Sequence, residues 1–436
     1  MWSEAAERYK TPIAEIFSAE NKLRYQLEVE VALSEVQEEL GIIPVGTSSL
    51  IAKAAPVVKL DRVNEIEKVI HHDLMSMVKA LTEASGDAGK FVHLGATSND
   101  IQDSVLALQM IETKSRLLDL LDKLSEILAN HATLHRETAC IARTHGQFAI
   151  PTTIGFKLAN FLYELRLAKI ELFRTNVKLS KFSGAVGNYA STMRLDIEEK
   201  LFAKLKLKPC LISTQVVSRV IHSQFMNSMA LIASVIERIS KEIRNLQRSE
   251  INEWQEPFAE KQVGSSAMPH KKNPHKSERI SGLARIIRSN VAISLENIAL
   301  EHERDISHSS VERVIIPQSA NLLYYITKSM ISILSGLKFN LAAIQENLEK
   351  ADTGKSEQIL IEMTKTIGRQ EAHELLRKHV NSDNFKEAVS TDKIILKYIP
   401  KEKLYKIFSH INVGLATEKV DSIINEYNIL WKNYRS

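Results

Sequence analysis

The chain of 436 residues has little glycine or proline, with 15 of the first and 10 of the second. Because both residues interrupt helices, their scarcity favours long helices. The two cysteines, Cys140 and Cys210, fit neither a disulfide framework nor a metal cluster. No apolar run approaches the roughly 18 residues of a membrane span, and the N-terminal MWSEAAERYK lacks the apolar core of a signal peptide. We therefore expect a cytoplasmic protein without a membrane partner.

A block of basic residues is also missing. The net charge of +4 is spread along the whole chain. This even distribution gives little support to nucleic-acid binding, although a small positive excess suits an anionic substrate.

Long stretches free of glycine and proline predict an all-α fold. We expect helices over 19–40 and from Asp61 to about Gly86, followed by rods over 96–135, 213–250 and 275–303. Residues 213–250 carry apolar side chains around more than one face. One chain does not supply enough neighbours for such a helix, so we expect a bundle formed by several chains. Helix-breaking residues near the ends of these stretches indicate domain boundaries, and we expect three domains, 1–95, 96–345 and 346–436.

The segment GSSAMPHKKNP, residues 264–274, interrupts these rods. Asn273 and Pro274 are a typical cap and first residue for the helix that follows. The positive end of that helix, together with Lys271 and Lys272, equips the segment to hold an anion such as a carboxylate. The alternative is a lysine-rich surface loop without a function.

Three further segments have residues suited to chemistry. RTHGQ at 143–147 places His145 where it is either a general acid or base or a histidine of the core. GATSND at 95–100 offers hydroxyls at a helix start, which serve either an anion site or a simple cap. ERDISHSSVER at 303–313 has two arginines that suit an oxyanion, or else forms a polar helix junction.

Taken together, these segments resemble the fumarase/aspartase superfamily of lyases, whose members share GSSxMPxKxNP. HHD at 71–73, THGQ at 144–147, STQVVSR at 213–219, ERDISHSSVER at 303–313 and the HK after MP resemble the adenylosuccinate lyases within it. The resemblance runs from Arg8 to about residue 380. It implies a three-domain all-α lyase with a signature loop at 262–275. It also implies a homotetramer in which very long helices are bundled across subunits and three subunits contribute to each active site.

The resemblance also implies the reaction and the residues that perform it. Fumarate is eliminated from adenylosuccinate, giving AMP, and from the succinylated imidazole carboxamide ribotide SAICAR, giving AICAR. Ser265 is the implied general base and His145 the general acid, with Lys271 and Glu278 as further catalytic residues. No metal or organic cofactor is implied. The implied substrate-binding residues are Arg8, Tyr9, His71, His72, Asp73, His93, Thr97, Ser98, Gln215, Ser266, Lys272, Asn273, Arg304, Ser309, Ser310 and Arg313.

Other interpretations compete with this one. A carboxymuconate cycloisomerase of the same superfamily also has MPHK, but would not need the phosphate-binding set at 8–9 and 303–313. A structural protein that has kept the fold is a second alternative, which the intact Ser265, His145, Lys271 and Glu278 disfavour. A nucleic-acid-binding role is the weakest.

Overall fold

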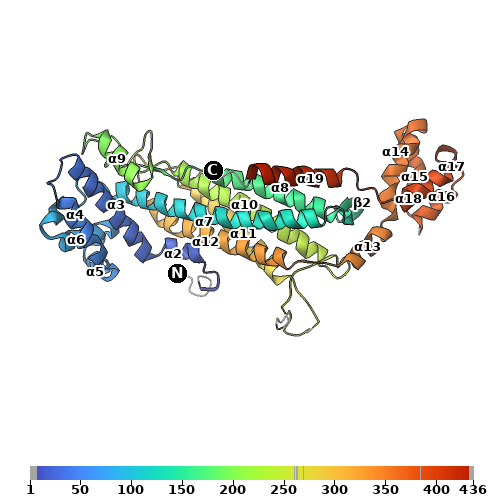
Figure 1. The fold of residues 1–436 in the computed structure, drawn as a ribbon, viewed down its shortest axis with the longest axis horizontal. Coiled ribbons are helices and arrows are strands. Elements are labelled where there is room, and N and C mark those ends of the chain that lie inside the picture. The colour runs from blue at the N-terminus through green and yellow to red at the C-terminus, as the bar shows by residue number, and fades with distance from the viewer. Residues whose placement is uncertain (1–6, 260, 262–263, 269, 383, 432–436) are drawn as a thin grey trace. The chain divides into compact units, whose positions relative to one another are not determined.

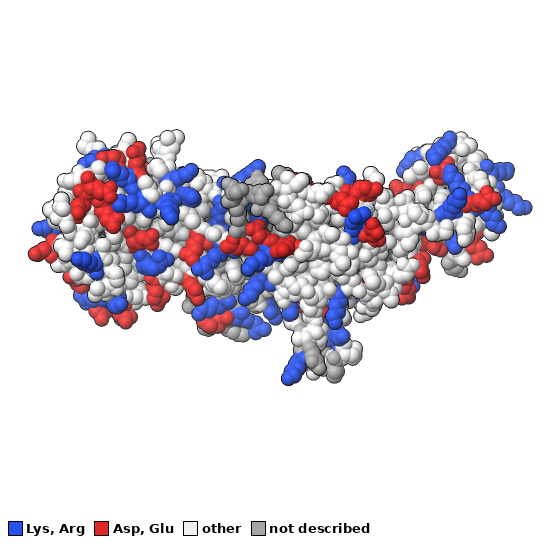
Figure 2. Space-filling model, viewed as in Figure 1, with Lys and Arg blue, Asp and Glu red and all other residues white. Residues whose placement is uncertain are grey.

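The computed structural model describes residues 7–259, 261, 264–268, 270–382 and 384–431. This part of the chain is mainly helical, with three two-stranded sheets of short strands (Figure 1). The prediction of an all-α fold is therefore confirmed. No helix among the described residues is both long and apolar enough to cross a membrane. On the face drawn in Figure 2, basic and acidic side chains are interspersed, as the even distribution of charge along the sequence predicts.

The N-terminal part contains short and medium helices that enclose a core around Leu33, Leu74 and Leu201, each at most 1% exposed. Its α-helices and 3-10 helices are α2 (Pro12–Ile16), α3 (Ala19–Glu39), α4 (Thr47–Ala54), η1 (Ala55–Val57), α5 (Leu60–Ile70), α6 (Asp73–Ser85), η2 (Gly86–Phe91) and, further along the chain, α9 (Leu195–Leu205).

The longest helices follow in the middle of the chain. They are α7 (Ser98–Leu134), α8 (Ile154–Arg174), α10 (Arg219–Leu246), α11 (His275–Glu296) and α12 (Ser307–Ser335). With 37 residues, α7 is about 55 Å long at a rise of 1.5 Å per residue. The strands are β1 (Ala139–Thr144), β2 (Gln147–Thr153), β3 (Leu179–Ser180), β4 (Lys208–Pro209), β5 (Trp254–Gln255) and β6 (Lys338–Phe339).

The C-terminal part has its own small core around Ile359, Met363, Phe385 and Leu404. It comprises α13 (Leu341–Lys350), η3 (Asp352–Lys355), α14 (Ser356–Ile367), α15 (Arg369–Arg377), α16 (Phe385–Thr391), α17 (Ile395–Tyr398), α18 (Lys401–Ser409), α19 (Ala416–Glu426) and η4 (Tyr427–Trp431).

The chain divides into two compact units. Unit 1 is Met1–Asp122, Leu167–Ile236 and Ile280–Ser329, and unit 2 is Lys123–Arg166, Glu237–Arg279 and Met330–Ser436. These boundaries differ from those of the three domains expected from the sequence, and that three-domain division stays a prediction.

Within unit 1, side-chain hydrogen bonds tie the long helices to one another. The Ser223 hydroxyl of α10 donates to the Ser294 carbonyl of α11 at 2.6 Å. The Asn290 amide of α11 donates to the Ser319 hydroxyl of α12 at 3.0 Å. All four residues are buried, so these bonds fix neighbouring helices in the interior.

The helix expected from Asp61 to Gly86 is in fact two helices. His71 ends α5 in the left-handed conformation with φ 53°, and the Nδ1 of His72 accepts a hydrogen bond from the Met75 amide at the start of α6. The His72 ring therefore caps the start of α6, and the chain forms two helices here in place of one continuous helix. This junction places His71, His72 and Asp73 at an interhelix corner.

The other rods are helical, with corrections to their bounds. The rod expected over 213–250 is helical over Arg219–Leu246 only. The rod expected over 275–303 ends at Glu296. Pro317 lies inside α12, although proline ordinarily interrupts a helix. The helix expected over 19–40 is confirmed as α3, with the Ser18 hydroxyl accepting from the Asn21 amide.

Candidate active site

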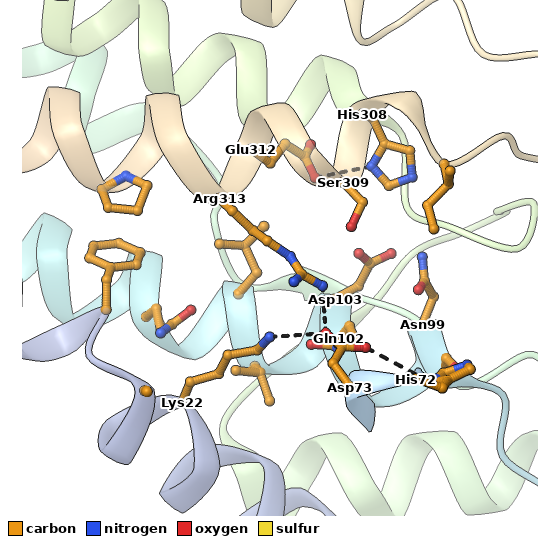
Figure 3. A pocket seen from close by; sticks show the side chains of 18 of the residues that line it. Lys22, His72, Asp73, Asn99, Gln102, Asp103, His308, Ser309, Glu312 and Arg313 are labelled. Atoms are coloured by element: carbon orange, nitrogen blue, oxygen red, sulfur yellow. Dashed lines mark hydrogen bonds and ion pairs between the residues drawn. The ribbon is translucent and has the colours of Figure 1, made fainter. Parts of the chain in front are cut away.

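A cavity of about 600 Å³ lies in unit 1 (Figure 3). Its walls come from α3, from the corner between α5 and α6, from the first turns of α7 and from α12. The predicted substrate-binding residues that line it are His71, His72, Asp73, Ser98, Arg304, Ser309 and Arg313. Segments that are far apart in the sequence thus meet at one site, as the hypothesis of a shared substrate requires.

The carboxylate of Asp73 binds two of the cations that line this cavity, Lys22 and Arg313 (Figure 3). Its Oδ2 atom accepts from the Lys22 ammonium at 3.4 Å, from the Gln102 amide at 3.3 Å and from the Arg313 guanidinium. Burial opposes ionisation of Asp73, but the charges of Lys22 and Arg313 outweigh it and hold the pKa of Asp73 below its usual range. Two cations thus share one carboxylate oxygen.

A second cluster of charged residues, mostly buried, also lines the cavity. Arg219 of α10 forms a two-pronged ion pair with Asp103 of α7 at 3.0 and 3.1 Å, and another with Glu312 of α12 at 3.1 Å for both contacts. The three residues are 3–8% exposed. His222 Nδ1 lies 2.8 Å from Glu312 Oε1, and His308 Nδ1 lies 3.1 Å from Glu312 Oε2. Burial opposes ionisation of Glu312, but these partners outweigh it and hold its pKa well below the usual range.

Sequence reasoning missed several residues of this site. Lys22 belongs to an amphipathic helix, where a lysine ordinarily indicates a solvated face, and nothing in its neighbours distinguishes it. Asp103 carries no sequence signal. Glu312 and Arg219 lie within the motifs ERDISHSSVER and STQVVSR, but their pairing joins residues far apart in the sequence and forms only on folding. The residues that line the cavity without having been predicted as ligands include Lys22, Glu67, Asn99, Gln102, Asp103, Arg219, His308 and Glu312.

Some predicted ligands in unit 1 do not line the cavity. His93 is left-handed with φ 62°, its Nδ1 is 2.7 Å from Glu30 Oε1, and its amide donates to the same carboxylate. Burial opposes protonation of His93, but Glu30 outweighs it and raises the pKa of His93. Thr97 donates its amide to Asp100 at 2.8 Å. Both residues thus shape the turn before α7.

The remaining predicted ligands of unit 1 also have other partners. Gln215 accepts from the Arg304 guanidinium at 2.8 Å, so it touches the cavity through that arginine. The exposed Ser310 donates to the Ser307 carbonyl. The Tyr9 ring packs edge-on against Tyr325, with ring centroids 5.0 Å apart. Arg8, which is exposed, is likewise not part of the cavity wall.

The predicted catalytic residues belong to unit 2. Ser265 lies in the expected loop, where its Oγ accepts from the Ala267 amide at 3.4 Å and the Met268 amide at 3.2 Å. A Cβ at Gly264 would lie 2.1 Å from the Lys271 carbonyl oxygen, so only glycine lets the two ends of the loop approach this closely. Asn273 donates to the Gly264 carbonyl at 3.0 Å and closes the loop.

The start of α11 differs from the prediction. The Lys276 and Ser277 amides donate to the buried carboxylate of Glu256 at 3.1 and 3.0 Å. Asn273 is therefore not the cap, and a carboxylate already occupies the amides that were expected to help hold a substrate anion. Ser266, Lys271, Lys272 and Glu278 have exposed side chains around this loop.

His145 lies at the tip of a β-hairpin and not at the end of a helix. Strands β1 and β2 pair up to Thr144 and Gln147, which leaves His145 and Gly146 as a two-residue turn. Both have positive φ, 54° and 78°, as this tight turn requires. The turn presents the His145 ring to solvent. No hydrogen bond in the described part of the chain joins His145 to Ser265 or Glu278.

Comparison with known proteins decides the family. A lyase family model matches residues 6–288. The adenylosuccinate lyase of Pyrococcus abyssi is 42% identical over 423 residues, covering 94% of each chain. That of Methanothermobacter thermautotrophicus is 42% identical over 438 residues, covering 96% of this chain and 97% of its own. The chain belongs to the adenylosuccinate lyase family.

Solved structures of the wider superfamily share the fold of this chain. A 3-carboxy-cis,cis-muconate lactonizing enzyme from Pseudomonas putida superposes with a TM-score of 0.88 at 25% identity, covering 98% of this chain and 99% of its own. A fumarate lyase from Mesorhizobium superposes with a TM-score of 0.86 at 26% identity, covering 95% and 97%. The predictions of a lyase and of a lyase fold are confirmed.

Proposed function

We propose that the protein eliminates fumarate from adenylosuccinate to give AMP, and from SAICAR to give AICAR. The observation that carries this proposal is the 42% identity to adenylosuccinate lyases across nearly the whole of both chains.

The cavity of unit 1 suits the nucleotide end of these substrates. A phosphate group carries nearly two negative charges, and arginine offers it planar pairs of donors. Arg304, Ser309 and Arg313 supply such donors from one stretch of chain. Asp73 keeps the empty cavity electrostatically balanced, because it accepts from Lys22 and Arg313 until a substrate anion takes its place.

The reaction requires removal of a weakly acidic proton from the carbon beside a carboxylate. An unperturbed serine could not take it. The two amides that donate to Ser265 Oγ stabilise the alkoxide more than the hydroxyl, because hydrogen bonds to a charged acceptor are stronger. This geometry supports Ser265 as the general base.

The roles of the other catalytic residues follow from the charges that develop on the substrate during the reaction. The intermediate carries a doubly charged aci-carboxylate, which the ammonium of Lys271, on the same loop as Ser265, would stabilise. Asn273 would serve the succinyl group only by exchanging its bond to Gly264 for one to substrate. His145 would then protonate the departing nitrogen, with Glu278 as its orienting partner.

We also propose a homotetramer whose active sites are shared between subunits. Large apolar side chains remain 38–48% exposed along the long helices, at spacings that put them on one face of α8 and of α11. Such stripes indicate contact with further helices, which other copies of the chain would supply. They comprise Phe156, Tyr163 and Leu167 on α8 and Ile286 and Ile293 on α11.

The test is turnover of three substrates by the purified protein. We expect loss of 280 nm absorbance with adenylosuccinate, release of AICAR and fumarate from SAICAR, and no reaction with 3-carboxy-cis,cis-muconate. Turnover of the muconate alone would replace this proposal with a cycloisomerase. Turnover of one succinyl nucleotide and none of the other would refute the dual activity.

A further inference from the structure

The side chain of Arg304 is held on two sides within unit 1. Its Nε donates to His308 Nε2 at 3.3 Å, and its Nη1 donates to the Gln215 side-chain oxygen at 2.8 Å. Gln215 is fixed in turn, because its amide donates to the Ala185 carbonyl at 2.9 Å. A guanidinium has five N–H donors. These two bonds set its plane, and the described part of the chain leaves the other donors for a ligand.

The bond from Arg304 determines the tautomer of His308. A ring nitrogen that accepts a hydrogen bond carries no proton, so the proton of the neutral ring is on Nδ1. That nitrogen lies 3.1 Å from Glu312 Oε2 and donates to it. His308 is 1% exposed, so its ring is largely shielded from bulk solvent. The imidazole thus connects a buried carboxylate to a cavity arginine. Figure 3 shows its contact with Glu312.

Glu312 is itself immobile. It accepts from Arg219 and His222 as well as from His308, and Arg219 is fixed by Asp103. This cluster joins α7, α10 and α12, so its carboxylate is placed by the packing of three helices. The position of His308 therefore depends on the frame of unit 1 and not on the cavity contents.

We propose that His308 is a positioning residue for substrate binding, acting through Arg304 and anchored by Glu312. The inference deepens the proposed function, since it takes Arg304 to bind the nucleotide phosphate. A guanidinium that is already oriented loses less side-chain entropy when the anion arrives, so the anion binds more tightly.

Two substitutions at one position separate positioning from general damage. His308→Leu removes both ring nitrogens, yet Glu312 keeps Arg219 and His222, so the buried carboxylate stays paired. His308→Gln is the matched control, because its oxygen can accept from Arg304 and its amide can donate to Glu312. We expect His308→Leu to weaken AMP binding and to raise KM for adenylosuccinate about tenfold, which is the effect of losing one charge-assisted hydrogen bond. The kcat should stay within about twofold of the wild type. His308→Gln should stay within about threefold of the wild type.

The deciding measurement is a double-mutant cycle for AMP binding by calorimetry. If His308 acts through Arg304, His308→Leu should cause no further loss in an Arg304→Ala background. Equal losses in both backgrounds would overturn the inference, as would a loss in kcat with KM unchanged. AMP binding needs no turnover. A wild type that binds AMP without cleaving adenylosuccinate would therefore refute the proposed function and leave this cycle to decide the positioning role by itself.

Discussion

Lys22 offers the sharpest test of the cavity in unit 1, because no motif pointed to it. We consider Lys22→Met, which keeps the length of the side chain and removes its charge. The Lys22 ammonium lies 3.4 Å from Asp73 Oδ2, and its side chain is 31% exposed. Burial, followed by the charge of Arg313, lowers the pKa of Lys22. The ammonium would therefore gain from an additional anion in the cavity.

The expected magnitude follows from these contacts. A hydrogen bond to a charged group contributes about 1.5–3 kcal/mol, and partial exposure of Lys22 argues for the lower end. About 1.4 kcal/mol corresponds to a tenfold change in affinity. Loss of Lys22 would also leave Arg313 as the main cationic partner of Asp73. This stronger pairing with Asp73 would weaken the contact of Arg313 with the phosphate. Both effects have the same sign, so we expect KM for adenylosuccinate to rise about tenfold.

The assay compares adenylosuccinate with succinyladenosine, the same molecule without its phosphate. Lys22→Met should lower kcat/KM for the phosphorylated substrate and leave that for the nucleoside within about twofold. Lys79→Met, an exposed lysine on α6 outside the cavity, is the control and should change neither. An equal loss on both substrates would show that Lys22 supports the fold and not the phosphate, and an unchanged KM would refute the assignment.

Two further predictions concern the buried cluster and the assembly. Glu312→Gln should lower the free energy of unfolding at pH 7 by about 3–5 kcal/mol, measured by urea denaturation, because it breaks a buried ion pair. The pKa of Glu312 is depressed in the folded protein, so its ionised carboxylate stabilises the fold above the unfolded pKa of about 4.3, and this stabilisation is lost as the pH falls. The difference in unfolding free energy between wild type and variant should therefore shrink on acidification, and a constant difference would contradict this. Mixing inactive His145→Ala and Ser265→Ala proteins should restore activity toward about a quarter of the sites, by symmetry, if different chains supply these residues. Background activity after subunit exchange confirmed by mass would place both in one chain.

The sequence predicts the helices well wherever local signals agree with packing. The helix expected over 19–40 is found as α3 between the Ser18 cap and Gly41, since a cap and a left-handed stop act within one turn. The corner at His71 and His72 was not predicted, because a histidine ring as a cap has no common sequence signature. The hairpin that carries His145 was also not predicted. His-Gly is an unusual pair for a two-residue turn, and a stretch without prolines indicated a helix instead.

The candidate site was predictable in part. Motifs identified Ser98, Arg304, Ser309 and Arg313, which the fold brings to one cavity. They could not say which neighbours hold those side chains, because such contacts join residues far apart in sequence. His93 illustrates this limit, since its ring is bound to Glu30, 63 positions earlier in the chain.

The role of Ser265 is the central claim and has a direct measurement. The Ser265→Ala protein should bind adenylosuccinate within about tenfold of the wild type, since the hydroxyl acts mainly in the transition state. Over hours of incubation it should release no AMP or fumarate detectable by chromatography, whereas the wild type should convert the substrate fully to both. A variant that retains a tenth or more of the wild-type kcat would contradict the account, because another group would then be the base.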